Sequence, residues 1–145
     1  MCLYLTKQNK EPKVAEKPIE CYKLVLKRAY NRLVTPFMHC EIDLGEVIKA
    51  YPCMPMVRKS ERKSEYPSKY SRYKFFVSVG VIHTFKTLEG AKKAARMLFF
   101  SSDIAIVKCT IPTRSLYFEG VFDDTGIQCY ASTSVRYWKK IVYQK

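Results

Sequence analysis

The chain is poor in glycine and has no long apolar run. Its five glycines form no glycine-rich loop of the kind that cradles phosphates, and no GxSxG turn presents a nucleophilic serine. The apolar runs, such as those at 75–77 and 97–100, are far shorter than the roughly 18–20 residues of a membrane-spanning helix. These absences argue against P-loop chemistry, serine-hydrolase chemistry and a helical membrane span.

Cysteine is present, but not in closely spaced pairs. No CxxC motif occurs, and the N-terminus, MCLYLTKQNKEPK, lacks the apolar core and cleavage site of a secretory signal. We therefore expect a cytoplasmic protein with reduced cysteines that act mostly as small apolar residues. A zinc site made of His39, Cys40, His83 and Cys109 lacks the usual ligand spacing, and we expect no metal or other cofactor. The cysteines are Cys2, Cys21, Cys40, Cys53, Cys109 and Cys129.

Positive charge is the strongest compositional feature. The chain has 26 basic and 13 acidic residues, a net charge of +13. Residues 58–74, RKSERKSEYPSKYSRYK, hold 7 basic and 2 acidic residues, an excess as large as that of all residues from 75 to 145. Such a field attracts phosphates and acidic surfaces.

The hydrophobic periodicity predicts one helix among many strands. TLEGAKKAARMLFF, at 87–100, has Thr87 as N-cap and an apolar stripe at helical spacing that includes Ala91 and Ala95. Residues 39–50 favour a strand that bends at Gly45, with a short helix as the alternative. Period-two alternation and turn residues predict strands at 20–28, at 73–85 with Gly80 as the break, and at 104–111, 115–122, 127–131 and 134–143.

This element order predicts a small α+β protein. We expect a flexible leader at 1–18 and a single domain at 19–145, with a mainly antiparallel sheet and one principal helix. Prolines and serines interrupt 52–72, which we interpret as a long basic, tyrosine-containing insertion loop. A run of about twenty residues without periodicity inside a compact domain is either functional or disordered.

The basic insertion is the first candidate binding site. Cations pair with phosphates, and flat rings stack on bases. The alternative is a solvated, mobile loop that its charges keep soluble. The candidate residues are Arg58, Lys59, Arg62, Lys63, Tyr66, Lys69, Tyr70, Arg72 and Tyr73.

The last strand is the second candidate surface. In VRYWKKIVYQK, strict alternation places Arg136, Trp138 and Lys140 on one face and Lys139 on the other. An indole between cations suits a phosphate-bearing ligand, whose base stacks on the ring while its phosphates pair with the cations. The alternative is a core or edge aromatic residue beside lysines that protect an exposed strand from aggregation.

Two single residues invite a catalytic interpretation. His83, in GVIHTF, stands directly before the helix, where a structural, hydrogen-bonded histidine is the alternative. Glu119, in SLYFEGVF, would suit a general base if it points inward and would be an ordinary surface residue if it points outward.

Several motifs support a family resemblance. MCLY, CYKLVL, TPF, IHTFKTLEGAKKAA, IVKCTIP, SLYFEG and YAS together span most of the chain outside 52–72. On these motifs the chain resembles a family of small uncharacterised proteins of gut bacteria and their tailed phages. The resemblance implies a protein of the bacterial cytoplasm with an accessory role, such as countering host immunity.

The strand that precedes the TLEGAKKAA helix also resembles the ADP-ribosyltransferase-like fold. Members of that fold carry an Arg or His on the first strand and a Glu on a late strand. Here Cys21, Tyr22 and Lys23 occupy the first strand, which departs from the pattern. The resemblance implies Tyr22, His83 and Glu119 as catalytic residues that act on a nicotinamide dinucleotide.

Three functional hypotheses follow. The first is a non-enzymatic binder of a phosphate-bearing ligand, which could be a nucleotide, a cyclic-nucleotide immune signal or nucleic acid. The second is the ADP-ribosyltransferase-like enzyme. The third is a basic module that docks on an acidic host protein. We expect no membrane partner, and self-association into a homo-oligomer stays open.

Overall fold

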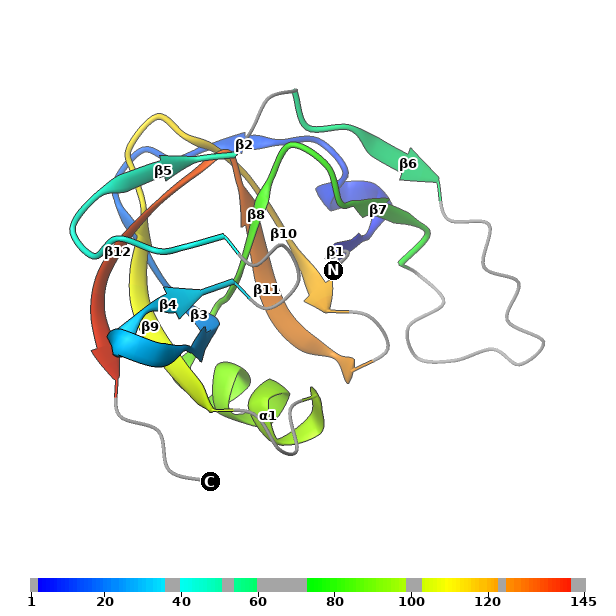
Figure 1. The fold of residues 1–145 in the computed structure, drawn as a ribbon. Helices are drawn as coiled ribbons and strands as arrows, with labels where there is room; N and C mark the ends of the chain where they lie inside the picture. Colours follow the sequence, from blue (N-terminus) through cyan, green and yellow to red (C-terminus); the bar gives the residue numbers. More distant parts are fainter. Residues whose placement is uncertain are drawn as a thin grey trace.

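The computed structural model describes residues 3–35, 40–50, 54–59, 73–98, 103–122 and 125–141. Within these ranges an antiparallel sheet dominates and one α-helix is present, so the α+β expectation holds with the sheet as the main part (Figure 1). The strands are β1 Leu3–Leu5, β2 Lys13–Val14, β3 Ile19–Lys27, β4 Leu33–Val34, β5 Val47–Lys49, β6 Val57–Lys59, β7 Phe75–Val77, β8 Ile82–Phe85, β9 Ile104–Ile111, β10 Leu116–Phe122, β11 Ile127–Ser132 and β12 Ser134–Ile141. The helical elements are α1 Leu88–Leu98 and the short 3-10 turns η1 Lys7–Asn9 and η2 Ala29–Asn31.

All twelve strands belong to one strongly curved sheet. Its order is β5-β12-β9-β3-β8-β11-β10-β1-β7-β6, with β4 beside β3 and β2 beside β10. The longest register joins β3 to β9, from Ile19 opposite Ile111 to Leu26 opposite Ile104. The sequence of β9, IAIVKCTI, is rich in β-branched residues and buried on both faces, as a central strand requires.

The sheet carries an apolar core on each face. On one face the fully buried Ala91, Ala94 and Ala95 of α1 pack with Leu24 and Ile106. Small alanines let the helix axis approach the sheet closely. The core of the other face is built from buried residues that include Cys21, Val25, Val107, Val135 and Tyr137.

The expectation of a flexible leader at 1–18 is wrong for the residues from 3 onwards. β1 lies between β10 and β7, where Leu3 faces both Phe122 and Val77. Leu3 and Leu5 are buried, so the segment belongs to the core. Farther along the chain, β2 pairs with the start of β10, where Val14 faces Leu116. Directly after β2, the N–H of Ala15 donates to the carbonyl of Ser115 at 2.9 Å.

The predicted helix and its cap are confirmed. The Thr87 hydroxyl accepts the N–H of Gly90 at 3.0 Å, which satisfies one of the free donors of the first helical turn. Gly80 separates β7 from β8 and Gly45 precedes β5, both with left-handed backbone at φ 75° and 91°. Among the described residues no helix is long and apolar enough to cross a membrane.

Candidate functional site

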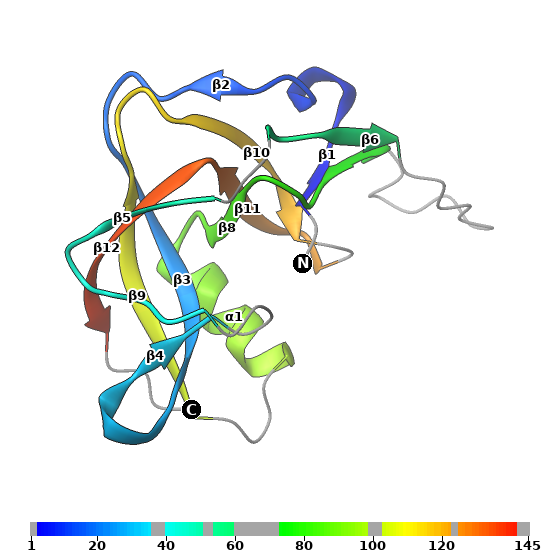
Figure 2. The same ribbon diagram turned by 45° about the horizontal axis from the view of Figure 1, so that its top comes forward.

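The two predicted cationic surfaces are separate in space. Arg58 and Lys59 lie on β6, at one end of the sheet, whereas Arg136, Trp138 and Lys140 lie on β12, next to the other end. Figure 2 shows β6 and β12 on opposite sides of the molecule. Of the other residues predicted for this site, Tyr73 lies just before β7 and is half-buried. The rest lie outside the described ranges: Arg62, Lys63, Tyr66, Lys69, Tyr70 and Arg72.

The pleat of the sheet separates Arg58 from Lys59. In the register with β7, Arg58 faces Phe76 and Lys59 faces Phe75. Residues directly opposite each other share a face, and neighbours along a strand point to opposite faces. Lys59 therefore shares its face with Phe75 and the buried core residue Leu5, while Arg58 shares the other face with Phe76 and Tyr4.

Lys59 lines a pocket of about 360 Å³. Four chain segments form it: the residues between η1 and β2, the residues up to and including β6, the start of β7, and the start of β10. The buried Phe118 and half-buried Phe75 give it an apolar interior. Its lining is Lys10, Glu11, Pro12, Met54, Pro55, Val57, Lys59, Phe75, Leu116 and Phe118.

The polar part of the pocket is mostly cationic. The Nζ atom of Lys10 lies 5.1 Å from the centre of the Phe75 ring, in a cation–π contact. Lys59 supplies a second ammonium group and Glu11 the one carboxylate of the lining. The arrangement combines cations with aromatic surface, as a ligand with an anionic group and an apolar body requires.

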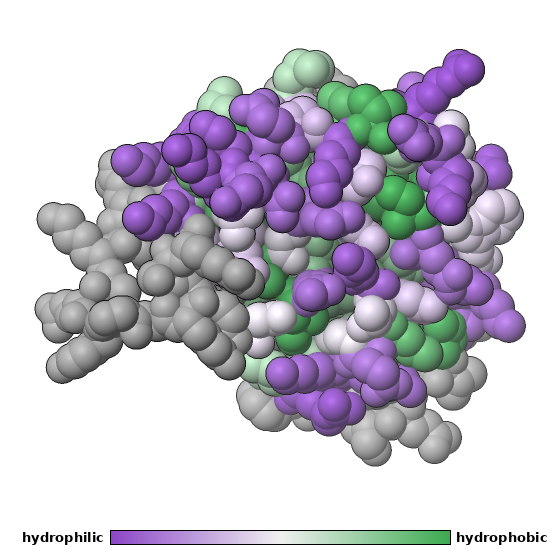
Figure 3. Space-filling view, turned by 180° about the vertical axis from the view of Figure 1, so that it is seen from behind, coloured by the Kyte–Doolittle hydropathy of each residue, from purple (hydrophilic) through white to green (hydrophobic). Residues whose placement is uncertain are grey.

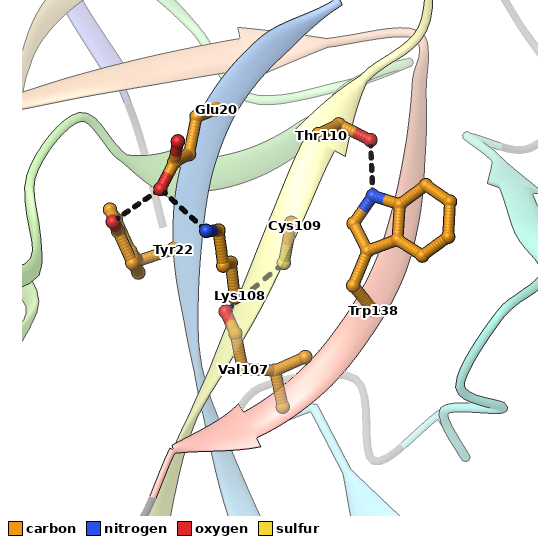
Figure 4. A network of polar contacts seen from close by, with 7 residues as sticks. All are labelled: Glu20, Tyr22, Val107, Lys108, Cys109, Thr110 and Trp138. Atoms are coloured by element: carbon orange, nitrogen blue, oxygen red, sulfur yellow. Dashed lines mark hydrogen bonds and ion pairs between the residues drawn. The ribbon is translucent and has the colours of Figure 1, made fainter.

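The second surface, around Trp138, is ordered by polar contacts (Figure 4). The indole Nε1 donates to the Thr110 hydroxyl at 2.7 Å, and the Arg136 guanidinium lies 4.9 Å from the centre of the indole. On β3, which pairs with β9, Glu20 accepts a hydrogen bond from the Tyr22 hydroxyl at 2.8 Å and forms an ion pair with Lys108 at 3.1 Å. The Tyr22 and Lys108 contacts lower the pKa of the Glu20 carboxyl.

The predicted grouping of Arg136, Trp138 and Lys140 on one face is wrong for Lys140. The β12–β9 register shifts between Tyr137 and Lys139, so that Lys139 faces Lys108 and Lys140 faces Val107. This bulge at Trp138 brings Lys139 to the face of Arg136 and turns Lys140 away. Strict alternation fails because one extra residue interrupts the ladder.

The three residues of the catalytic hypothesis do not meet. Tyr22 faces Phe85 of β8, and His83 points to the same side of β8 because it is two residues from Phe85. Tyr22 and His83 therefore lie on the face of the sheet that α1 covers in part. Glu119 faces Tyr130, which faces Thr84, and this places Glu119 on the opposite face. There it pairs with Lys13 at 3.6 Å.

His83 is a buried neutral residue. It is 8% exposed, and neither ring nitrogen has a hydrogen-bond partner among the described residues. Burial, followed by the nearby Lys23 charge, lowers the His83 pKa to about 3. Lys23 donates to the His83 carbonyl at 2.8 Å, and burial of its ammonium group lowers the Lys23 pKa. The described residues therefore do not provide the side-chain hydrogen bond that we expect of a structural histidine.

The described cysteines fit the expectation of free thiols. Cys21 and Cys109 face each other across β3 and β9 and are fully buried, whereas Cys40 is exposed. Burial raises the Cys109 pKa, and the hydrogen bond with Cys109 lowers that of Cys21. Within the described ranges no three potential ligands gather around a metal position, and His39 lies outside them.

Sequence reasoning did not find Lys10 or Lys139. Lys10 stands in the segment predicted to be a flexible leader, and nothing in its local sequence, QNKEPK, signals a pocket. Strict alternation predicts the wrong face for Lys139, because a bulge leaves no clear trace in the periodicity. Both residues depend on pairing between distant strands, which a local pattern does not encode.

Comparisons with known proteins add no further constraint. No protein-family model, curated protein or solved structure matches this chain. The two resemblances stay predictions that rest on short motifs, and a function has to be argued from the geometry of the sites.

Proposed function

We propose that the protein is a non-enzymatic binder of a small phosphate-bearing molecule, held in the pocket that Lys10 and Lys59 line. The observation that carries the proposal is the combination of two lysines with aromatic surface in one cavity of about 360 Å³. Small-molecule sites are typically concave, of about 300–1,000 Å³, mostly apolar and supplied with a few well-placed polar groups. A nucleotide matches both parts of such a pocket.

Each lining group has a distinct role in this proposal. The ammonium groups of Lys10 and Lys59 pair with the phosphate, because charge-assisted hydrogen bonds are the strong ones. Phe75, Phe118 and Leu116 contact the base and bury its apolar surface. Glu11, the acidic member of the lining, accepts a hydrogen bond from a sugar hydroxyl or an exocyclic amino group.

The ligand class follows from the same chemistry. The motif resemblance to phage proteins favours a cyclic-nucleotide immune signal, which a binder without catalytic residues would sequester. A mononucleotide is the alternative within the same class. The enzymatic hypothesis finds no support in the register, since Glu119 lies on the opposite face from Tyr22 and His83.

A thermal-shift assay with a panel of mono-, di- and cyclic nucleotides tests the proposal. A ligand at 100 times its Kd adds about 2.7 kcal/mol to the free energy of unfolding, so at least one nucleotide should raise the Tm clearly. Lys59→Met should weaken binding of that nucleotide about tenfold or more, because it removes a charged hydrogen bond.

Arg58→Met is the matched control. It removes the same charge from the neighbouring position on β6, but on the opposite face of the sheet. Its affinity should stay close to that of the wild type. If no nucleotide shifts the Tm, or if both variants lose affinity equally, the pocket does not bind nucleotides.

A further inference from the structure

The face of the sheet that carries Trp138 is only half covered. The end with Leu24 and Ile106 packs under α1, while the other end, with Thr110 and Lys108, is open. Trp138 is 48% exposed. This open face consists of Glu20 and Tyr22 of β3, Lys108 and Thr110 of β9, and Arg136, Trp138 and Lys139 of β12. The proposed nucleotide pocket uses none of these residues.

The indole of Trp138 is held in place before any ligand binds. Its N–H donates to Thr110, and the Arg136 guanidinium packs on the ring. Both contacts come from within the sheet, so the ring loses little further freedom when a partner arrives. A large aromatic side chain that is fixed and yet half exposed offers a stacking surface.

The cations on this face repel one another. Lys139 and Lys108 lie directly opposite each other on β12 and β9, and like charges in that position destabilise a sheet. Glu20 neutralises Lys108, at 3.1 Å. Among the described residues of this face Glu20 is the acidic one, and neither Arg136 nor Lys139 forms an ion pair with it. A bound polyanion would relieve the repulsion.

We propose that the open face binds single-stranded nucleic acid. A base stacks on Trp138, while Arg136, Lys139 and Lys108 contact the phosphates on either side. Stacking platforms beside cations are the usual means of binding single strands. Duplex nucleic acid would gain less, because its bases are already stacked, and an acidic protein would use the cations but leave the indole without a matching ring.

Tryptophan fluorescence gives a direct measurement, because Trp138 is the only tryptophan of the chain. An oligothymidylate of about twelve nucleotides, within the usual site size of single-strand binders, should quench its emission in a saturable way at low salt. With three phosphate contacts, the slope of log K against log salt should be near −2, from about −0.7 per contact.

Two neighbouring lysines provide the matched pair of variants. Lys139→Gln should weaken oligonucleotide binding several-fold and reduce the salt slope by about 0.7. Lys140→Gln removes the same charge on the opposite face and should change neither. By anisotropy of a labelled oligonucleotide, Trp138→Ala should lose about fivefold or more in affinity, and Trp138→Phe should retain most of it.

Several outcomes would overturn the proposal. The first is an absence of quenching by oligothymidylate, and the second is an equal loss of affinity in the Lys139 and Lys140 variants. The third is quenching by duplex DNA or by polyglutamate that equals the quenching by oligothymidylate. Equal quenching by polyglutamate would point to an acidic protein partner. Because Lys59→Met should leave oligonucleotide binding unchanged, failure of this proposal is distinguishable from failure of the pocket. If Trp138→Ala does not fold, the lysine pair still decides the question.

Discussion

Burial decides the protonation state of His83. The residue is 8% exposed, its ring nitrogens have no hydrogen-bond partner among the described residues, and its pKa is about 3. A neutral imidazole without a partner is an energetic cost, since an unsatisfied buried polar group disfavours folding by about 1–3 kcal/mol. At neutral pH His83 is a weak candidate for a proton donor.

We expect His83→Leu to stabilise the protein at pH 7 by about 1 kcal/mol and to reduce its acid sensitivity. The folded pKa of about 3 lies below the unfolded value of about 6.5. Between these values the unfolded chain binds more protons, so this residue makes stability fall as the pH drops from 6.5 towards 3. Urea unfolding of both proteins at several pH values measures the difference. A destabilised variant with an unchanged pH profile would contradict this account.

At the scale of elements, β1 depends on one glycine of β10. A Cβ at Gly120 would collide with the Tyr4 carbonyl oxygen and lie 3.0 Å from a Leu3 side-chain atom. Glycine therefore allows the N-terminal strand to dock against β10. The leader becomes part of the core because of a residue more than a hundred positions away.

Gly120→Ala should lower the free energy of unfolding by roughly 2 kcal/mol or more, because overpacking a tight site typically costs 1–3 kcal/mol. Chemical denaturation measures the loss, and hydrogen exchange should show that the amides of β1 lose protection first. Gly45→Ala serves as comparison. It has open space for a Cβ but a left-handed backbone, so it should lose only about 1–2 kcal/mol. Equal losses would mean that the contact with β1 is not what Gly120 provides.

The elements differ in how well the sequence predicts them. The long strands β3 and β12 follow from alternation and β9 from its run of β-branched residues. The helix α1 follows from a 3.6-residue stripe and the Thr87 cap, because the residues of each element carry the pattern. The three-residue strand β1 does not, because so short a segment is held by partners on both sides. The sequence pattern also does not predict the bulge at Trp138, so it assigns Lys139 and Lys140 to the wrong faces of the sheet.

At the scale of the whole molecule, polar residues are spread widely over the surface. Figure 3 shows hydrophilic side chains over much of one face, with apolar residues between them. Composition predicts the sign of the partner's charge, but it does not locate a site. The pocket requires Lys10, Lys59 and Phe118 to meet from three distant segments, and only the sheet topology brings them together. The anionic class of ligand therefore stays a prediction from composition, and the sequence alone does not assemble the pocket proposed to hold it.

The net charge of +13 also bears on stability. Folding concentrates this charge, so self-repulsion disfavours the compact state, and salt screens the repulsion. Raising the ionic strength from about 0.01 M to 0.15 M shortens the Debye length from about 30 Å to 8 Å. We expect the Tm to rise by several degrees over this range, as differential scanning fluorimetry in sodium chloride would measure.

Lys139→Glu should reduce this salt dependence, because it replaces the repulsion with Lys108 by an attraction. The variant should have a higher Tm than the wild type at low salt, and the two Tm values should converge at high salt. Lys140→Glu changes the net charge equally without facing Lys108, so its gain should be smaller. Equal gains would mean that overall charge alone destabilises the fold; a larger gain at position 139 would locate the cost on the open face, where an anionic partner could offset it.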